Sequence, residues 1–398
     1  MAVAGERGRF AVAVAYCAFV LVGVSAGVGG VLLPAQMSDY GVDRAKIGIT
    51  FFVFSAGFML AGASTGALVH RLGTRVALAA GTAVFALSAF YTATRPTFAG
   101  LVVVQVALGY GIGVLEAVLN TYLAQLSGAA RRVNWLHAFF GVGALVGPLL
   151  ATWMLSSRSW TSVWLVIAVL LVPLLIGILL AFPLGASSGP APGTERRGLL
   201  TDTVRDRSVQ LGALFLAVYV GLEISVGNWG FSFLVDGRGQ SRLLAGYAVS
   251  GFWFGLTAGR FVISPVASWI GLSELGMTFA CLTGIAAVIG LIWLASGPVM
   301  DSASFALLGF FLGPVFPTTM AITPRLTEQR RVPTAIGVIN GVSVIGGSVL
   351  PWLAGTITES AGVSALIPFS VTLAALLLLI WWRLARQLGL VRQTVTVG

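Results

Sequence analysis

Twelve long apolar segments follow one another along the chain, and each is long enough to cross a bilayer as a helix. Such a helix needs about 20 mostly apolar residues. The segments lie near residues 10–34, 44–69, 75–94, 97–127, 132–155, 159–183, 207–235, 241–270, 273–296, 298–327, 331–358 and 362–386. Because only 9 % of the residues are charged, the chain lacks the polar surface of a soluble enzyme, a secreted disulfide-linked domain or a disordered chain. The sequence therefore predicts an all-α integral membrane protein.

A polar segment rich in proline, glycine and serine separates the sixth span from the seventh. Its composition is typical of a linker, which we expect at residues 184–206. The chain would then consist of an N-terminal six-helix bundle, 1–183, and a C-terminal six-helix bundle with a short tail, 207–398.

The two halves share a weak internal repeat. Gly109 and Gly113 in the fourth span have counterparts 200 residues later in Gly309 and Gly313 of the tenth. The repeat predicts two pseudo-symmetric bundles, an organisation found in transporters that work by alternating access. The alternative is that glycine-rich helices resemble one another by chance.

Basic residues are distributed unevenly between the two sides of the membrane. If the N-terminus is cytoplasmic, 16 of the 23 basic residues fall inside and 6 outside, while Arg260 lies within the eighth span. This asymmetry predicts a multi-pass protein of the inner (plasma) membrane with both termini in the cytoplasm. The net charge of +10 does not indicate nucleic-acid binding, because the arginines form no basic stripe.

The sequence carries no recognisable enzymatic motif. It has no phosphate-binding glycine loop, no HExxH and no paired cysteines. Cys17 and Cys281 both lie within apolar segments, and His70 and His137 are the two histidines. We therefore predict no catalytic residue, no metal site and no cofactor.

Four titratable groups are placed well inside predicted spans, namely Glu116, Glu223, Arg260 and His137. Each is costly at the centre of a bilayer, so such residues usually mark a transport pathway. A carboxyl group there can bind and release protons, and we predict that Glu116 and Glu223 carry out proton coupling. The structural alternative is a static carboxylate, with Arg260 as the partner of Glu223 from the next helix.

Further polar and aromatic side chains are candidates for contact with a substrate. Asn and Glu can hydrogen-bond sugar hydroxyls, while Trp offers a flat apolar face to C–H groups. The predicted substrate-binding residues are Asn120, Asn134, His137, Tyr219, Asn228 and Trp229. Trp229 could instead belong to an interfacial aromatic belt. Pro314 and Pro317 predict a bent gating segment in the tenth span, because proline removes backbone hydrogen bonds.

The loop at residues 66–75 has the sequence GALVHRLGTR. It resembles the pattern Gly-x-x-x-Asp-Arg-x-Gly-x-Arg, which lies between the second and third helices of the major facilitator superfamily. Gly66, Arg71, Gly73 and Arg75 match the pattern, whereas His70 replaces the acid. The resemblance implies a gating or structural role for Arg71, Gly73 and Arg75.

Five further segments contain the candidate residues or lie beside them: GVLEAVLN with Glu116 and Asn120, VNWLHAFFGVGA with Asn134 and His137, YVGLEISVGNW with Glu223, FGLTAGRF with Arg260, and FPTTM in the tenth span. Within this superfamily, these segments resemble the fucose permease branch of sugar–proton symporters. The resemblance implies that Glu116 takes part in proton-coupled transport. One departure is in the first span, where Gly30 replaces the branch's acid, and Asp39 lies too far along the helix to substitute for it.

These observations predict a monomeric secondary transporter whose partners are protons, the lipid bilayer and a small polar solute, a sugar or sugar-like compound. One alternative is a proton-driven drug or metabolite efflux antiporter, because Gly143, Gly147 and Pro148 resemble a Gly-x-x-x-Gly-Pro motif of that class. Another is a non-transporting receptor, which would have no need of acids inside its spans.

Overall fold

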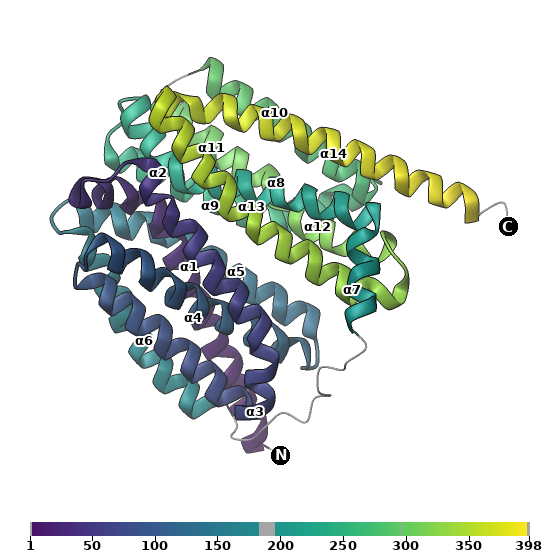
Figure 1. The fold of residues 1–398 in the computed structure, drawn as a ribbon, viewed down its shortest axis with the longest axis horizontal. Coiled ribbons are helices and arrows are strands. Elements are labelled where there is room, and N and C mark those ends of the chain that lie inside the picture. The colour runs from purple at the N-terminus through teal and green to yellow at the C-terminus, as the bar shows by residue number, and fades with distance from the viewer. Residues whose placement is uncertain (1, 183–195, 296, 396–398) are drawn as a thin grey trace. The chain divides into compact units, whose positions relative to one another are not determined.

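The computed structural model describes residues 2–182, 196–295 and 297–395, and over these ranges the chain forms helices and no β-strand (Figure 1). Ten segments of this part of the chain are long and apolar enough to cross a membrane. One of them, Arg44–Ala93, contains two of the expected spans. The 28-residue α9 is long enough to be a further span, although Arg260 makes it less apolar. Counting Arg44–Ala93 as two spans and adding α9 gives the twelve predicted spans.

The chain divides into two compact units, Met1–Gly193 and Thr194–Gly398. The described helices of the first unit are α1 (Ala2–Tyr40), the short α2 (Arg44–Ile47), α3 (Ile49–Ala93), α4 (Phe98–Ala124), α5 (Ala129–Leu155) and α6 (Trp160–Ala181). α3 joins the second and third expected spans across Gly73, where the backbone has φ 81°. A glycine adopts this conformation without steric cost, which explains why the signature loop has one at this position.

The second unit begins with a short helix, α7 (Arg196–Arg205), within the range expected for the linker. The helices that follow are α8 (Arg207–Ser232) with a π-helical end η1 (Phe233–Gly237), α9 (Arg242–Trp269), α10 (Glu274–Leu294), α11 (Pro298–Leu312), α12 (Val315–Ile322), the short η2 (Thr323–Arg325) and η3 (Gln329–Arg331), α13 (Val332–Ala361), η4 (Val363–Ala365) and α14 (Leu366–Val395). α11 and α12 together form the expected tenth span, which is interrupted at Gly313 and Pro314. Pro317 lies inside α12. The expected bend is therefore present as a helix break, and its role in gating stays a prediction.

Side-chain caps fix where several helices begin. An oxygen acceptor just before a helix can bond one of the backbone N–H groups that the first turn leaves unpaired. The side chains that accept such bonds are those of Thr97 before α4, Asp206 before α8, Ser241 before α9 and Ser273 before α10. These polar residues interrupt the apolar sequence at the points where the chain turns back.

Glycines bring helices into close contact in the same way in both units. A Cβ atom on Gly109 of α4 would lie 2.1 Å from the carbonyl oxygen of Phe54 in α3. In the second unit, a Cβ atom on Gly309 of α11 would lie 2.0 Å from the carbonyl oxygen of Phe252 in α9. Close packing of this kind replaces the hydrophobic effect as the force that holds helices together in lipid. The glycines noticed 200 residues apart in sequence thus pack equivalent helix pairs.

Gly309→Ala should therefore lower the stability of the protein by about 1–3 kcal/mol, because backbone atoms cannot rotate away from the added methyl group. The matched control is Gly290→Ala in α10, where a Cβ atom would meet nothing within 4 Å. The free energy of unfolding of the control should lie within about 0.5 kcal/mol of the wild-type value. Thermal unfolding of the two purified variants in detergent measures the difference, and equal melting temperatures would contradict the packing account.

The motif that resembles drug antiporters also lies in a helix contact. Cβ atoms on Gly143 and Gly147 of α5 would lie 2.0 and 2.8 Å from the carbonyl oxygens of Val20 and Val24 in α1. Helix packing therefore accounts for both glycines without any role in efflux.

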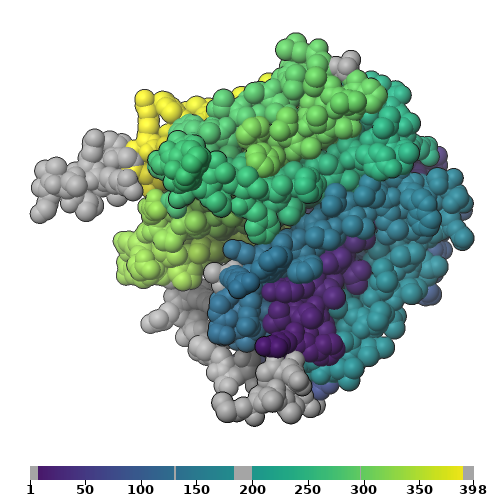
Figure 2. Space-filling view, turned by 180° about the vertical axis from the view of Figure 1, so that it is seen from behind, coloured from purple at the N-terminus to yellow at the C-terminus, as the bar shows by residue number. Residues whose placement is uncertain are grey.

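Large apolar side chains are exposed on the helices of both units, including Trp153, Val169, Leu180, Trp269 and Leu294. Figure 2 shows one face of this helical surface. An α-helix satisfies its backbone hydrogen bonds internally and can therefore lie in lipid. An apolar exterior is expected for helices whose solvent is lipid rather than water.

Candidate functional site

In the first unit, the structure brings together two of the predicted substrate-binding residues. The Asn120 Oδ1 atom in α4 lies 3.2 Å from Nε2 of His137 in α5. The Asn120 amide group also donates a hydrogen bond of 2.9 Å to the backbone carbonyl of Glu116, one turn earlier. Asn120 is thereby oriented by its own helix and connects α4 to α5.

Glu116 is half-buried beside this pair. Its side chain lies on the same helix face as Asn120, because residues four apart are neighbours on a helix. The hydrogen bond from Asn120 uses the backbone carbonyl of Glu116, so the carboxyl group takes no part in it. The proton-coupling role of Glu116 stays a prediction.

His137 and Asn134 are exposed on one face of α5. The ring of Phe19 in α1 meets the His137 ring edge-on, with ring centroids 5.7 Å apart. Three helices therefore contribute to the surroundings of His137, and sequence reasoning did not identify the contact with Phe19.

In the second unit, buried Tyr219 and Glu223 of α8 form a polar cluster with half-buried Arg260 of α9. The Tyr219 hydroxyl donates a hydrogen bond of 2.9 Å to the backbone carbonyl of Leu312, at the break before α12. The same hydroxyl lies beside both the Glu223 carboxyl group and the Arg260 guanidinium group. Glu223 is only 9 % exposed.

The predicted partnership of Glu223 and Arg260 is more indirect in the structure than the sequence suggested. Arg260 attracts Glu223 electrostatically, yet none of the ion pairs within 4.0 Å in the described ranges joins these two side chains. The Arg260 Nε atom is buried and without a hydrogen-bond partner. Tyr219 is therefore the residue that connects the acid to the base, and a direct pair stays a prediction for the transport cycle.

The other candidates on α8 are engaged with neighbouring helices. The Trp229 indole N–H donates a hydrogen bond of 2.7 Å to the backbone carbonyl of Pro351 in α13. Trp229 and Tyr219 are both almost fully buried, whereas Asn228 is half-buried. In this conformation the two aromatic rings pack inside the unit, and their contact with a substrate stays a prediction.

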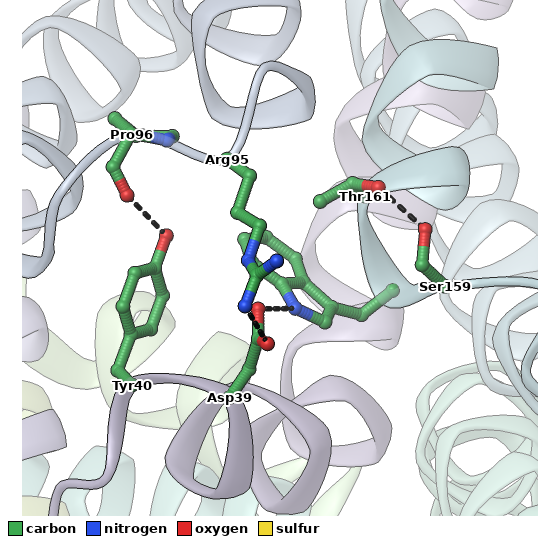
Figure 3. A network of polar contacts seen from close by, with 7 residues as sticks. Asp39, Tyr40, Arg95, Pro96, Ser159 and Thr161 are labelled. Carbon is green, nitrogen blue, oxygen red and sulfur yellow. Dashed lines mark hydrogen bonds and ion pairs between the residues drawn. The ribbon is translucent and has the colours of Figure 1, made fainter.

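Asp39 at the end of α1 belongs to a separate network (Figure 3). Its carboxylate pairs with Arg95, in the turn before α4, and accepts a hydrogen bond of 2.9 Å from the Trp160 indole of α6. The neighbouring Tyr40 hydroxyl donates to the backbone carbonyl of Pro96 at 2.9 Å. These contacts fasten one end of the first unit. Asp39 therefore has a structural role in these contacts. This agrees with the prediction that Asp39 does not substitute for the acid that Gly30 replaces.

The signature loop has a well-defined backbone but altered charges. Gly73 is buried, Arg75 is half-buried with an unpartnered Nε atom, and Arg71 and His70 are exposed. The acid that would counter these arginines in the usual signature is absent from this sequence. The gating role of Arg71 and Arg75 stays a prediction.

The family model described as Major Facilitator Superfamily matches residues 15–306. The chain belongs to the major facilitator superfamily. It is therefore a multi-pass membrane transporter rather than an enzyme, and the resemblance of the loop at residues 66–75 is confirmed at the level of the family.

The chain is also similar to individual proteins over most of its length. It is 26 % identical to the Bypass of stop codon protein 6 of Saccharomyces cerevisiae, over 91 % of this chain and 80 % of that protein. It is 24 % identical to the glucose/mannose transporter GlcP of Bacillus subtilis, over 85 % of this chain and 86 % of that protein. The crystal structure of a variant of the E. coli fucose:proton symporter FucP superposes with a TM-score of 0.65 at 18 % identity, covering 95 % of this chain and 98 % of that chain. The last likeness confirms the fold.

Proposed function

We propose that this transporter carries a sugar or sugar-like solute in symport with protons, by alternating access, as a monomer in the inner (plasma) membrane with both termini cytoplasmic. The similarity to a glucose/mannose transporter over 85 % of the chain supports the sugar class. The observation that carries the proposal is the Asn120–His137 pair next to Glu116, which places hydroxyl-binding groups one helical turn from an ionisable carboxyl group.

Binding of hexoses to the purified protein tests the substrate class. A thermal-shift panel should compare glucose, galactose, mannose and fucose with nucleosides and with lipophilic cations. Stabilisation by at least one hexose is expected, because a ligand that binds only the folded state raises its melting temperature. Stabilisation by lipophilic cations alone would overturn the sugar proposal and favour efflux of amphipathic compounds.

Asn120→Ala and Asn134→Ala should each weaken the binding of that hexose about 5- to 150-fold, since a hydroxyl of the bound sugar that is shielded from water and left unpaired costs about 1–3 kcal/mol. Thr121→Ala is the matched control, because the hydroxyl of exposed Thr121 donates only to the Ala117 carbonyl of its own helix. Titration calorimetry measures the three affinities. Wild-type affinity in both asparagine variants would place the substrate elsewhere.

A further inference from the structure

A fully buried carboxylate lies at the beginning of α11 in the second unit, and the transport proposal makes no use of it. Asp301 is 1 % exposed. Its Oδ2 atom accepts hydrogen bonds from the Gln240 side-chain amide and, at 3.4 Å, from the backbone N–H of Gly297. Its Oδ1 atom is buried and has no partner.

Two further oxygen atoms, in Gln240 and Ser304, are also buried without a hydrogen-bond partner. Gln240 is 9 % exposed, and while its amide nitrogen binds Asp301, its Oε1 atom is buried without a partner. Ser304 lies one turn farther along α11 on the same face as Asp301, and its Oγ atom is also buried and unpartnered. The Asp301 and Gln240 oxygens can only accept, and the Ser304 hydroxyl oxygen can accept as well as donate, so the three together fit an electropositive ligand.

The described residues do not supply a basic partner. No ion pair within 4.0 Å reaches Asp301 in the ranges that the structure describes. Arg238 and Arg242 each lie two residues from Gln240 in the sequence. The Arg238 guanidinium group donates to the backbone carbonyl of Ile292 and lies 5.4 Å from the Phe233 ring centre, and Arg242 is exposed. A buried carboxylate without a compensating charge is strongly unfavourable.

We propose that Asp301, Gln240 and Ser304 form a binding site for a monovalent metal cation, with sodium as the ion of choice. Oxygen ligands select hard cations. A single carboxylate among neutral oxygens balances one positive charge, whereas a divalent ion would leave an excess charge buried. The cation would join the turn that carries Gln240 to the first turn of α11.

This site is separate from the Tyr219 cluster of the same unit. Leu312, whose carbonyl binds Tyr219, lies 11 residues beyond Asp301 on α11. At a rise of 1.5 Å per residue, this distance is about 16 Å along the helix axis. Binding of the cation can therefore be tested independently of substrate and proton coupling.

The test is the melting temperature of the purified full-length protein in sodium chloride compared with N-methyl-D-glucamine chloride at equal ionic strength and pH. Sodium at ten times its dissociation constant should raise the melting temperature by about 1–2 °C, and the rise should continue with the logarithm of the sodium concentration. Potassium and lithium series identify the preferred ion. An unchanged wild-type melting temperature in all these salts would overturn the proposal, with a buried water as the simplest replacement.

Variants connect the effect to the site. Asp301→Asn should abolish the response to sodium. Ser304→Ala should raise the dissociation constant for sodium, fitted from the melting temperature as a function of sodium concentration, at least fivefold. Ser302→Ala is the matched control, because the hydroxyl of half-buried Ser302 already donates to the Pro298 carbonyl of its own helix. A full response in Asp301→Asn or Ser304→Ala would contradict the assignment. If Asp301→Asn does not fold, the comparison of Ser304→Ala with Ser302→Ala still decides whether sodium binds at this site.

Discussion

Glu116→Gln should abolish the accumulation of sugar driven by a pH gradient while leaving exchange of sugar between two loaded compartments intact. Glutamine resembles the protonated carboxyl group, so the variant can complete the substrate-loaded half of the cycle but cannot release a proton. The substitution also leaves the local structure in place, because Asn120 bonds the backbone carbonyl of residue 116 rather than its side chain.

The measurement is uptake of labelled sugar into proteoliposomes with and without a pH gradient, alongside exchange at equal concentrations. The accumulation ratio should fall to one in Glu116→Gln. Glu274→Gln is a suitable control, because Glu274 is an exposed acid paired with Arg325 at the start of α10. Uphill accumulation in Glu116→Gln would remove this residue from the coupling mechanism.

The second large effect is expected in the Tyr219 cluster. Arg260→Ala should destabilise the protein by about 1–3 kcal/mol, because it leaves the buried Glu223 without a compensating charge. Arg260 is half-buried, so the loss should be smaller than the about 3–5 kcal/mol of a fully buried pair. Adding Glu223→Gln should restore much of the loss, since the uncompensated charge is then gone.

A double-mutant cycle on thermal or denaturant unfolding measures this coupling. Tyr219→Phe belongs in the same series, because its hydroxyl adjoins both charged groups and bonds Leu312. We expect Tyr219→Phe to reduce the coupling between Glu223 and Arg260. If the losses of the two single variants simply add, the two residues do not interact and Glu223 acts independently.

The apolar segments predicted the helices well because length and hydropathy alone decide whether a segment can cross lipid. The proximity of Glu223 to Arg260 also followed from their depth in adjacent spans. Sequence could not show that Asn120 contacts His137 or that Tyr219 lies between the acid and the base. Both contacts depend on the rotation of the helices about their axes.

The burial of Asp301 could not be predicted from the sequence. It follows Pro298 at the very start of a span, where an acid is usually interpreted as a helix-capping residue at the interface. Its burial depends on Gln240, which is 61 residues earlier and lies in a polar turn. Neither residue belongs to a metal-binding motif, so no local pattern indicated a site there.

Uptake by the reconstituted wild-type protein tests proton-coupled sugar transport most directly. Proteoliposomes with an alkaline interior should accumulate labelled hexose several-fold above the external concentration. A protonophore should reduce this accumulation to equilibration, and addition of hexose should make the interior more acidic. Hexose uptake that is indifferent to the pH gradient, or no hexose uptake together with extrusion of lipophilic cations, would contradict the account.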